Sequence, residues 1–104
     1  MEPKIAHIVY FELADASEPK VEELISEIKK YLNDHPGLES FGVGRLNQDL
    51  SREVNDKDFH VSLHTLFSNR QAHDDYQVSA RHVQFIEKNK SNWKKVRVFD
   101  SNLA

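Results

Sequence analysis

Residues 5–13 form a largely apolar run in which β-branched and aromatic side chains are frequent. This composition predicts a β-strand. One face of the strand would carry Ile8 and Tyr10, and the other would carry His7, Val9, Phe11 and Leu13. Because both faces are largely apolar, we expect this strand to be covered on both sides.

A helix is predicted for the segment that follows. Residues 15–19 combine short oxygen-bearing side chains, an acid and a proline, which together are typical of a helix start. Apolar residues then recur at helical spacing and form one stripe, which consists of Val21, Leu24, Ile25, Ile28 and Leu32. The proline and glycine within residues 33–37 predict the end of this helix.

Two more strands are predicted on either side of a long loop. Residues 38–46 form the first strand, residues 47–57 are polar without periodicity and predict an exposed hairpin loop, and residues 59–67 largely alternate between apolar and polar side chains. One face of this third strand would carry Phe59, Val61, Leu63, Thr65 and Phe67. The opposite face would carry His60, Ser62, His64 and Leu66.

The remaining elements complete a recognisable order. Ser68 and Gln71 have capping-box spacing, so a helix is predicted from there to about Ser79. A short helix is predicted around residues 82–86, and residues 93–99 form a fourth strand. The order β-α-β-β-α-(α)-β predicts a single α+β domain over residues 1–104, with a ferredoxin-like antiparallel sheet and helices on one face.

The sheet face without helices is predicted to be too apolar to remain in water. It would carry Ile8, Tyr10, Leu66, Val96 and Val98. The simplest cover is the same face of a second copy, which would produce a dimeric α+β barrel. A chain of 104 residues also has a small core, so we expect a homodimer.

Composition and charge exclude several classes of function. The formal net charge is −3, so no overall field attracts nucleic acid or an anionic membrane. The chain has no cysteine, which excludes disulfides, thiolate metal sites and a cysteine nucleophile. No apolar run reaches the length of a membrane span, and the first residues lack the apolar stretch of a signal peptide. We therefore expect a cytoplasmic protein that binds neither nucleic acid nor membrane.

Six histidines raise the question of a metal site. His60 and His64 are four residues apart, a spacing that binds zinc on a helix. On a strand the same spacing separates the two side chains by about 13 Å, too far to share one ion. His35 and His73 are expected at the surface. The sequence therefore predicts no metal site and no cofactor.

Three other polar side chains fall among apolar neighbours and are candidates for chemistry. His7 is predicted on the helix-facing side of its strand, either as a hydrogen-bonded core histidine or as the wall of a cavity. On one unbroken helix Tyr76 and His82 would point about 120° apart. They converge only if the helix breaks between them, and a hydroxyl and an imidazole in one pocket could then perform general acid–base chemistry. Otherwise Tyr76 anchors its helix and His82 begins the next.

The arrangement of short motifs resembles the stress-responsive dimeric α/β barrel (Dabb) family. The motifs span nearly the whole chain and comprise His7-Ile8-Val9, Pro36-Gly37, Gly44, Phe67, Tyr76, His82-Val83-x-Phe85 and Val98-Phe99-Asp100. The resemblance implies a homodimeric α+β barrel, and some members of the family are linked to stress responses.

One plant member of this family, olivetolic acid cyclase, is a polyketide cyclase with a tyrosine–histidine pair. The resemblance implies that Tyr76 would orient or polarise a substrate and that His82 would act as general base. This chain departs from the cyclase in three places. Ser79-Ala80 replaces a His-Pro pair, Val61 replaces a histidine, and Ile28 replaces a tyrosine. The expected cavity is therefore more apolar than that of the cyclase.

Three functions remain open from the sequence. The first is a Dabb domain of uncharacterised function with a small, mostly apolar pocket under the helices for an apolar or aromatic ligand. Its expected wall is His7, Val9, Phe11, Leu24, Ile28, Val61 and Leu63. The second is a cyclase-like or monooxygenase-like enzyme that uses Tyr76 and His82 for proton transfer. The third is a purely structural dimerisation module.

Overall fold

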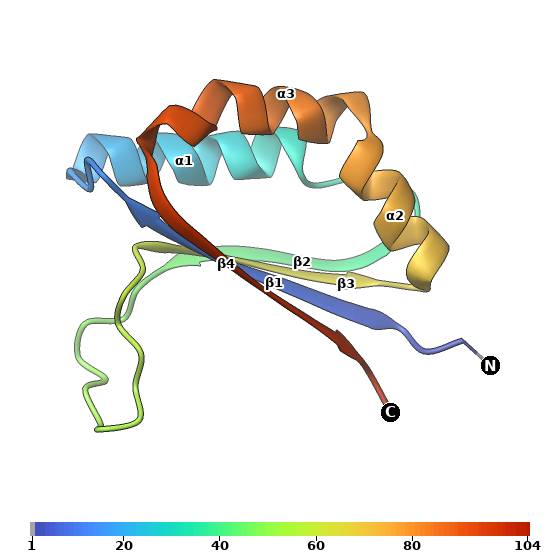
Figure 1. The fold of residues 1–104 in the computed structure, drawn as a ribbon, viewed down its shortest axis with the longest axis horizontal. Coiled ribbons are helices and arrows are strands. Elements are labelled where there is room, and N and C mark those ends of the chain that lie inside the picture. The colour runs from blue at the N-terminus through green and yellow to red at the C-terminus, as the bar shows by residue number, and fades with distance from the viewer. Residues whose placement is uncertain (1) are drawn as a thin grey trace.

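The chain folds as one four-stranded sheet with a layer of helices on one of its faces (Figure 1). The structure is a computed structural model, and it describes residues 2–104. In chain order the elements are β1 (Ile5–Leu13), α1 (Glu18–Tyr31), β2 (Leu38–Arg45), β3 (Val61–Phe67), α2 (Arg70–Val78), α3 (Ala80–Asn89), the 3₁₀-helix η1 (Lys90–Asn92) and β4 (Trp93–Asn102).

The strands lie in the order β2-β3-β1-β4, and every neighbouring pair is antiparallel. This topology confirms the ferredoxin-like α+β fold predicted from the sequence. The three α-helices cover the same face of the sheet, and the opposite face carries no helix (Figure 1). Within residues 2–104, none of the helices has both the length and the apolar character that crossing a membrane requires.

The core lies between the helices and the sheet. The predicted stripe of α1 faces this core, and its residues Val21, Leu24, Ile28 and Leu32 are buried. From β1 and β3 the residues that alternate toward the helices are buried against them, which places His7 inside the protein. The polar face of α1 and the loop between β2 and β3 remain in solvent. The sequence pattern therefore located the core correctly along these elements.

The orientation of β4 differs from the prediction. Val96 lies opposite Phe11 and Val98 lies opposite Val9, so both valines face the helices rather than the open side of the sheet. A register shift next to Leu13 adds one residue to β4 just after Trp93. This extra residue, of the kind that a β-bulge inserts, reverses the alternation beyond it. Because of it, Trp93 and the two valines share one face.

Two smaller predictions near β3 and α2 are also corrected. Phe59 precedes β3 and packs against Tyr10 on the open face, with ring centroids 4.8 Å apart, instead of facing the core. The N-cap of α2 is Asn69, whose side chain accepts a hydrogen bond from the backbone N–H of Ala72 at 2.9 Å. The predicted capping residue Ser68 therefore lies one position outside the helix.

The open face of the sheet is apolar, as expected, although its composition changes with the corrected register. Ile8, Tyr10 and Phe59 lie there with Phe99, which is 53% exposed. Residues 46–60 leave the sheet on this same side and extend away from the helices (Figure 1). Between the loop and the sheet is a hollow of about 520 Å³.

Gly37 joins the turn after α1 to the start of α2. Its φ angle is +79°, a conformation that L-amino acids with a side chain rarely adopt, and an added methyl group would overlap the Cβ atom of Ala72. Its carbonyl also accepts a hydrogen bond from the backbone N–H of Ser68 at 2.9 Å. The glycine therefore allows α2 to approach the sheet closely.

We expect Gly37→Ala to lower the free energy of unfolding by about 2–4 kcal/mol, because it adds backbone strain and a steric overlap. Urea denaturation followed by circular dichroism measures this change. Gly44→Ala is the matched control, since its Cβ would lie 3.9 Å from Ser62 Oγ, an ordinary contact. A Gly37→Ala variant as stable as Gly44→Ala would contradict the prediction.

Candidate functional site

The candidate site begins with the break between α2 and α3. Ser79 separates the two helices and has an extended backbone, with φ −64° and ψ 149°. Its hydroxyl donates to the carbonyl of Tyr76 at 2.9 Å and accepts from the backbone N–H of His82 at 3.2 Å. One side chain thus ends the first helix and caps the second, so no proline is needed for the break.

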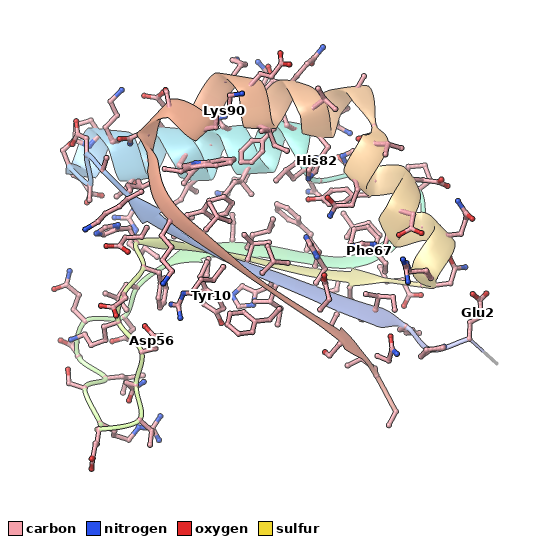
Figure 2. The ribbon with its side chains drawn as sticks, in the orientation of Figure 1. Glu2, Tyr10, Asp56, Phe67, His82 and Lys90 are labelled. Atoms are coloured by element: carbon pink, nitrogen blue, oxygen red, sulfur yellow. The ribbon has the colours of Figure 1, made fainter. Side chains whose placement is uncertain are left out.

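The break brings Tyr76 and His82 together. Their ring centroids lie 4.8 Å apart, and both residues are buried, with exposed fractions of 2% and 9%. His7 approaches from β1, with its ring centroid 6.0 Å from that of Tyr76. His82 lies under the first turn of α3, between this helix and the sheet (Figure 2). The structure therefore brings together the three polar residues that the sequence singled out.

These three residues line a pocket of about 180 Å³ between the sheet and the last two helices. Its other lining residues are Val9, Phe11, Leu32, Leu63, Gln77, Phe85, Ile86, Trp93, Val96 and Val98. The two valines are partly exposed, so the pocket lies along the β4 edge of the sheet. The wall is mostly apolar with a few polar points, which is the usual composition of a small-molecule site.

Three buried polar atoms of the pocket residues have no hydrogen-bonding partner among residues 2–104. They are Tyr76 Oη, His82 Nδ1 and Trp93 Nε1. A buried polar atom without a partner costs about 1–3 kcal/mol. Groups of this kind are uncommon in folded proteins, and here all three belong to residues around one pocket.

Burial sets the protonation states in this pocket. Burial, reinforced by the charges of His7, His35 and His73, lowers the pKa of His82 to about 4. Burial also raises the pKa of the Tyr76 hydroxyl above its ordinary value. At neutral pH the pocket therefore contains a neutral imidazole that is able to accept a proton and a phenol that is able to donate a hydrogen bond.

His7 is held by groups on neighbouring strands. Its Nδ1 atom lies 2.5 Å from a carboxylate oxygen of Asp100, the residue directly opposite it on β4. Thr65 Oγ1 donates to the His7 backbone carbonyl at 2.6 Å. Burial lowers the pKa of His7, and the hydrogen bond to Asp100 opposes this shift. This is the partner that a buried imidazole requires, and the imidazole also lines the pocket.

The other predicted pocket residues divide into two groups. Val9, Phe11 and Leu63 line the pocket as expected. Leu24, Ile28 and Val61 do not line it; they are buried in the hydrophobic core. Periodicity identified the buried face of each element, but it does not distinguish a filled part of that face from a hollow one.

Two histidines that were expected at the surface lie closer to the site. His35 is 8% exposed, and its ring centroid lies 4.9 Å from that of Tyr76. His73 is partly buried, and its ring centroid lies 5.1 Å from that of His7. A loop position for His35 and an exposed-looking helix position for His73 suggested exposure, yet both rings pack close to the site.

Some lining residues were missed altogether. Trp93, Val96 and Val98 reach the pocket because of the register shift in β4, which leaves no clear mark in the sequence. Gln77 follows Tyr76 on α2 and also lines the pocket. For Asp100 a signal existed, because the antiparallel pairing of the first and last strands brings the end of one near the start of the other.

A model of the stress responsive A/B barrel domain, Dabb, matches residues 5–103. The chain belongs to the Dabb family. No curated protein matches it at a significant level.

Solved structures share the fold of this Dabb chain. A Dabb family protein from Mesorhizobium loti has a TM-score of 0.82 and 23% identity, with 99% of each chain covered. A dimeric ferredoxin-like protein of unknown function from Thermobifida fusca has a TM-score of 0.81 and 17% identity, over 99% of this chain and 93% of that one. A hydroxynitrile lyase from Passiflora edulis has a TM-score of 0.80 and 14% identity, over 100% of this chain and 96% of that one.

The low pKa of His82 makes the stability of this Dabb domain depend on pH. Between pH 6.5, where an unperturbed histidine titrates, and about 4, the unfolded chain binds a proton at His82 that the folded chain does not. The free energy of unfolding should therefore fall as the pH falls through this range, with on the order of 3 kcal/mol due to His82. His82→Gln should remove this contribution.

Urea denaturation at pH values across this range measures the slope for the wild-type chain, for His82→Gln and for the control His64→Gln, which alters an exposed histidine of β3. Carboxylates contribute equally in all three, so the difference between slopes isolates His82. Equal slopes in the wild-type chain and His82→Gln would contradict the assignment.

Proposed function

We propose that this Dabb domain is a homodimer in which each chain binds a small aromatic molecule in the pocket beneath α2 and α3. The observation that supports this most directly is the pocket of about 180 Å³ with three buried, unpartnered polar atoms in residues that line it.

The size of the pocket limits the ligand. Most sites for drug-sized molecules have a volume of roughly 300–1,000 Å³. An apolar cavity of about 150 Å³ binds benzene. The present pocket, at about 180 Å³, therefore suits a single aromatic ring with one small substituent. Phe11 and Phe85 would contact the ring, and the valines of β4 would contact it at the edge of the sheet.

The unpartnered polar atoms of the pocket determine which substituent the aromatic ring of the ligand should carry. Tyr76 Oη donates a hydrogen bond, and the neutral His82 imidazole accepts or donates one according to its tautomer. A hydroxyl or carbonyl group on the ring would bond to both, because the two rings are only 4.8 Å apart. Phenols and aromatic aldehydes carry such groups, whereas benzene and toluene would leave the buried atoms unpartnered.

The open face of the sheet supports the homodimer. Tyr10, Phe59 and Phe99 form an aromatic group there, and the adjoining loop adds Leu50 and Val54, both of which are exposed. Large exposed apolar surfaces of this kind mark interaction sites. The Thermobifida fusca protein with this fold is described as dimeric. We therefore assign a second copy of the chain to this face.

A second candidate function is an enzyme that transfers protons between a substrate and Tyr76 or His82. The specific observation is that Tyr76 and His82 line one pocket and that each has a buried polar atom without a partner, the hydroxyl of Tyr76 and Nδ1 of His82. His82 would accept a proton from the substrate while Tyr76 donates a hydrogen bond to a substrate oxygen. The Passiflora edulis protein with this fold is a hydroxynitrile lyase, so the fold is able to carry an enzyme site.

Ligand binding is tested with phenol and toluene. Trp93 is the one tryptophan in the chain and lines the pocket, so its fluorescence reports on occupancy. Phenol should bind more tightly than toluene to the wild-type chain. Tyr76→Phe should weaken phenol binding about 5- to 10-fold, the effect of one hydrogen bond, and leave toluene unchanged.

A substitution that fills the pocket is the control for this prediction. Val98→Phe places a larger side chain in the pocket wall and should abolish binding of both ligands, whereas Val83→Phe, at an exposed position of α3 outside the pocket, should not. Binding that is equal in Val98→Phe and Val83→Phe would exclude this pocket as the ligand site. The structural dimerisation module would then be the better explanation of the fold.

A charged side chain introduced on the open face of the sheet tests the dimer. Phe99→Lys places a cation on the open face, where it would be buried by a second sheet, and should convert the dimer to a monomer in sedimentation at micromolar concentration. Val83→Lys, at a position exposed on α3, should remain dimeric. A wild-type chain that sediments as a monomer would contradict this part of the proposal.

The enzyme alternative is tested with mandelonitrile as probe substrate and release of benzaldehyde as readout. If His82 is the base, His82→Ala should reduce the rate above background about 100-fold, while His64→Ala should not change it. A rate no higher than background, or one unaffected by His82→Ala, would count against this second function and leave the binding proposal intact.

A further inference from the structure

We propose that His7, His73 and Asp100 form a binding site for one divalent transition-metal ion, such as Zn²⁺. Each residue offers one ligand atom, and these atoms all lie within 4.8 Å of one another. This inference goes beyond the proposed function, because the site lies outside the inner pocket, on the side of His7 that faces Asp100. It also revises the sequence-based prediction that the chain has no metal site.

Three separate elements bring the ligands together. His7 on β1 and Asp100 on β4 are directly opposite each other in the sheet and point to the same side. His73 lies in the first turn of α2, and its ring centroid is 5.1 Å from that of His7. The three residues are far apart in the sequence, so the cluster exists only in the folded chain.

The distances suit one ion. In a tetrahedral zinc site the metal–ligand distances of about 2.0–2.2 Å place ligand atoms roughly 3.4 Å apart. The largest separation in the cluster, at most 4.8 Å, is no more than about 1.4 Å longer than that spacing. His7 Nδ1 and Asp100 Oδ1, which share a hydrogen bond at 2.5 Å, would release its proton and move apart when an ion binds. The Asp100 side chain is half-exposed and the His73 side chain is 15% exposed, so Asp100 has the most room to adjust around the buried His7.

The ligand types indicate the class of metal. Two imidazoles and one carboxylate favour zinc and other transition metals of intermediate softness. Ca²⁺ and Mg²⁺ prefer a shell made of oxygen atoms alone, which this cluster does not supply. Three protein ligands also leave at least one coordination position for water or another small molecule.

Neighbouring groups support the role of His73 as a ligand. Its Nδ1 atom lies 3.0 Å from a carboxylate oxygen of Asp74, which fixes the proton on Nδ1 and leaves a lone pair on Nε2. The amide nitrogen of Gln77, a hydrogen-bond donor, lies 3.4 Å from His7 Nε2 and 3.5 Å from His73 Nε2, so both nitrogens face it as acceptors and a bound ion would take its place at His73 Nε2. Carboxylate–histidine pairs of this kind are typical around metal sites, where they orient the ligating ring.

An ion can reach the cluster from solvent. His73 and Asp100 line an outer pocket of about 460 Å³ at the end of the sheet, and Glu2 adds a negative charge to its rim. Arg70 lies on the same rim, but its guanidinium is bonded to Asp74 at 2.9 Å, which reduces its repulsion of a cation. The open coordination position would therefore face this outer pocket.

The experiment is a titration of the full chain with Zn²⁺ in competition with a chromogenic chelator, and with Co²⁺ by visible absorption. We expect one equivalent of metal per chain and the absorption bands of a four- or five-coordinate Co²⁺ ion. His73→Gln and Asp100→Asn should each weaken binding at least tenfold. Both positions are partly or largely exposed, so the variants should fold, which circular dichroism verifies.

His64→Gln is the matched control, since it removes an exposed histidine that pairs with Ile8 and faces the opposite side of the sheet from the cluster, and it should leave metal binding unchanged. Absence of binding at micromolar Zn²⁺, or equal affinity in the wild-type chain and His73→Gln, would overturn the proposal. The phenol titration of the inner pocket is a separate measurement. Its failure with metal binding retained would count only against the proposed function.

Discussion

The site depends on one hydroxyl group. The side chain of Ser79 bonds to the carbonyl of Tyr76 and to the backbone N–H of His82, so the chain changes direction between α2 and α3. On a continuous helix these two residues would point about 120° apart, and His82 would not lie over the sheet beside Tyr76. A serine at this position performs locally what a proline would impose by steric exclusion. The departure from the cyclase at this position therefore does not prevent the convergence of the two side chains.

The second constraint is the register of β4. An additional residue after Trp93 reverses the alternation, so Trp93, Val96 and Val98 all face the helices. Without it, the valines would lie on the open face and the pocket would lose one wall. The same shift places Phe99 on the open face, where it meets Tyr10 with ring centroids 5.8 Å apart. One irregularity thus shapes both the inner pocket and the apolar surface assigned to a second copy.

Most of the fold could be predicted from local patterns, because amphipathic periodicity reports directly which face of an element is buried. The stripe of α1 and the alternating apolar positions of β3 are examples, and both hold in the structure. The predictions were wrong where burial depends on tertiary contacts, which local patterns do not contain. Val96 and Val98 were assigned to the wrong face because nothing in the sequence marks the extra residue. His35 was expected at the surface because it lies in a loop, and His73 because its position on a helix looked exposed, yet both rings pack close to the site, beside Tyr76 and His7 respectively.

His7 connects the inner pocket to the outer cluster. It is 4% exposed, and a buried imidazole is costly unless its nitrogens have partners. Asp100 supplies one partner through Nδ1, while the ring also forms part of the pocket wall beside Tyr76. The His7 ring contacts both Asp100 and the pocket, so a change of charge near Asp100 alters the electrostatic environment of the pocket. A cation bound there would keep the Asp100 carboxylate ionised and disfavour a proton on His7, which preserves the neutral, apolar character of the pocket that an aromatic ligand requires.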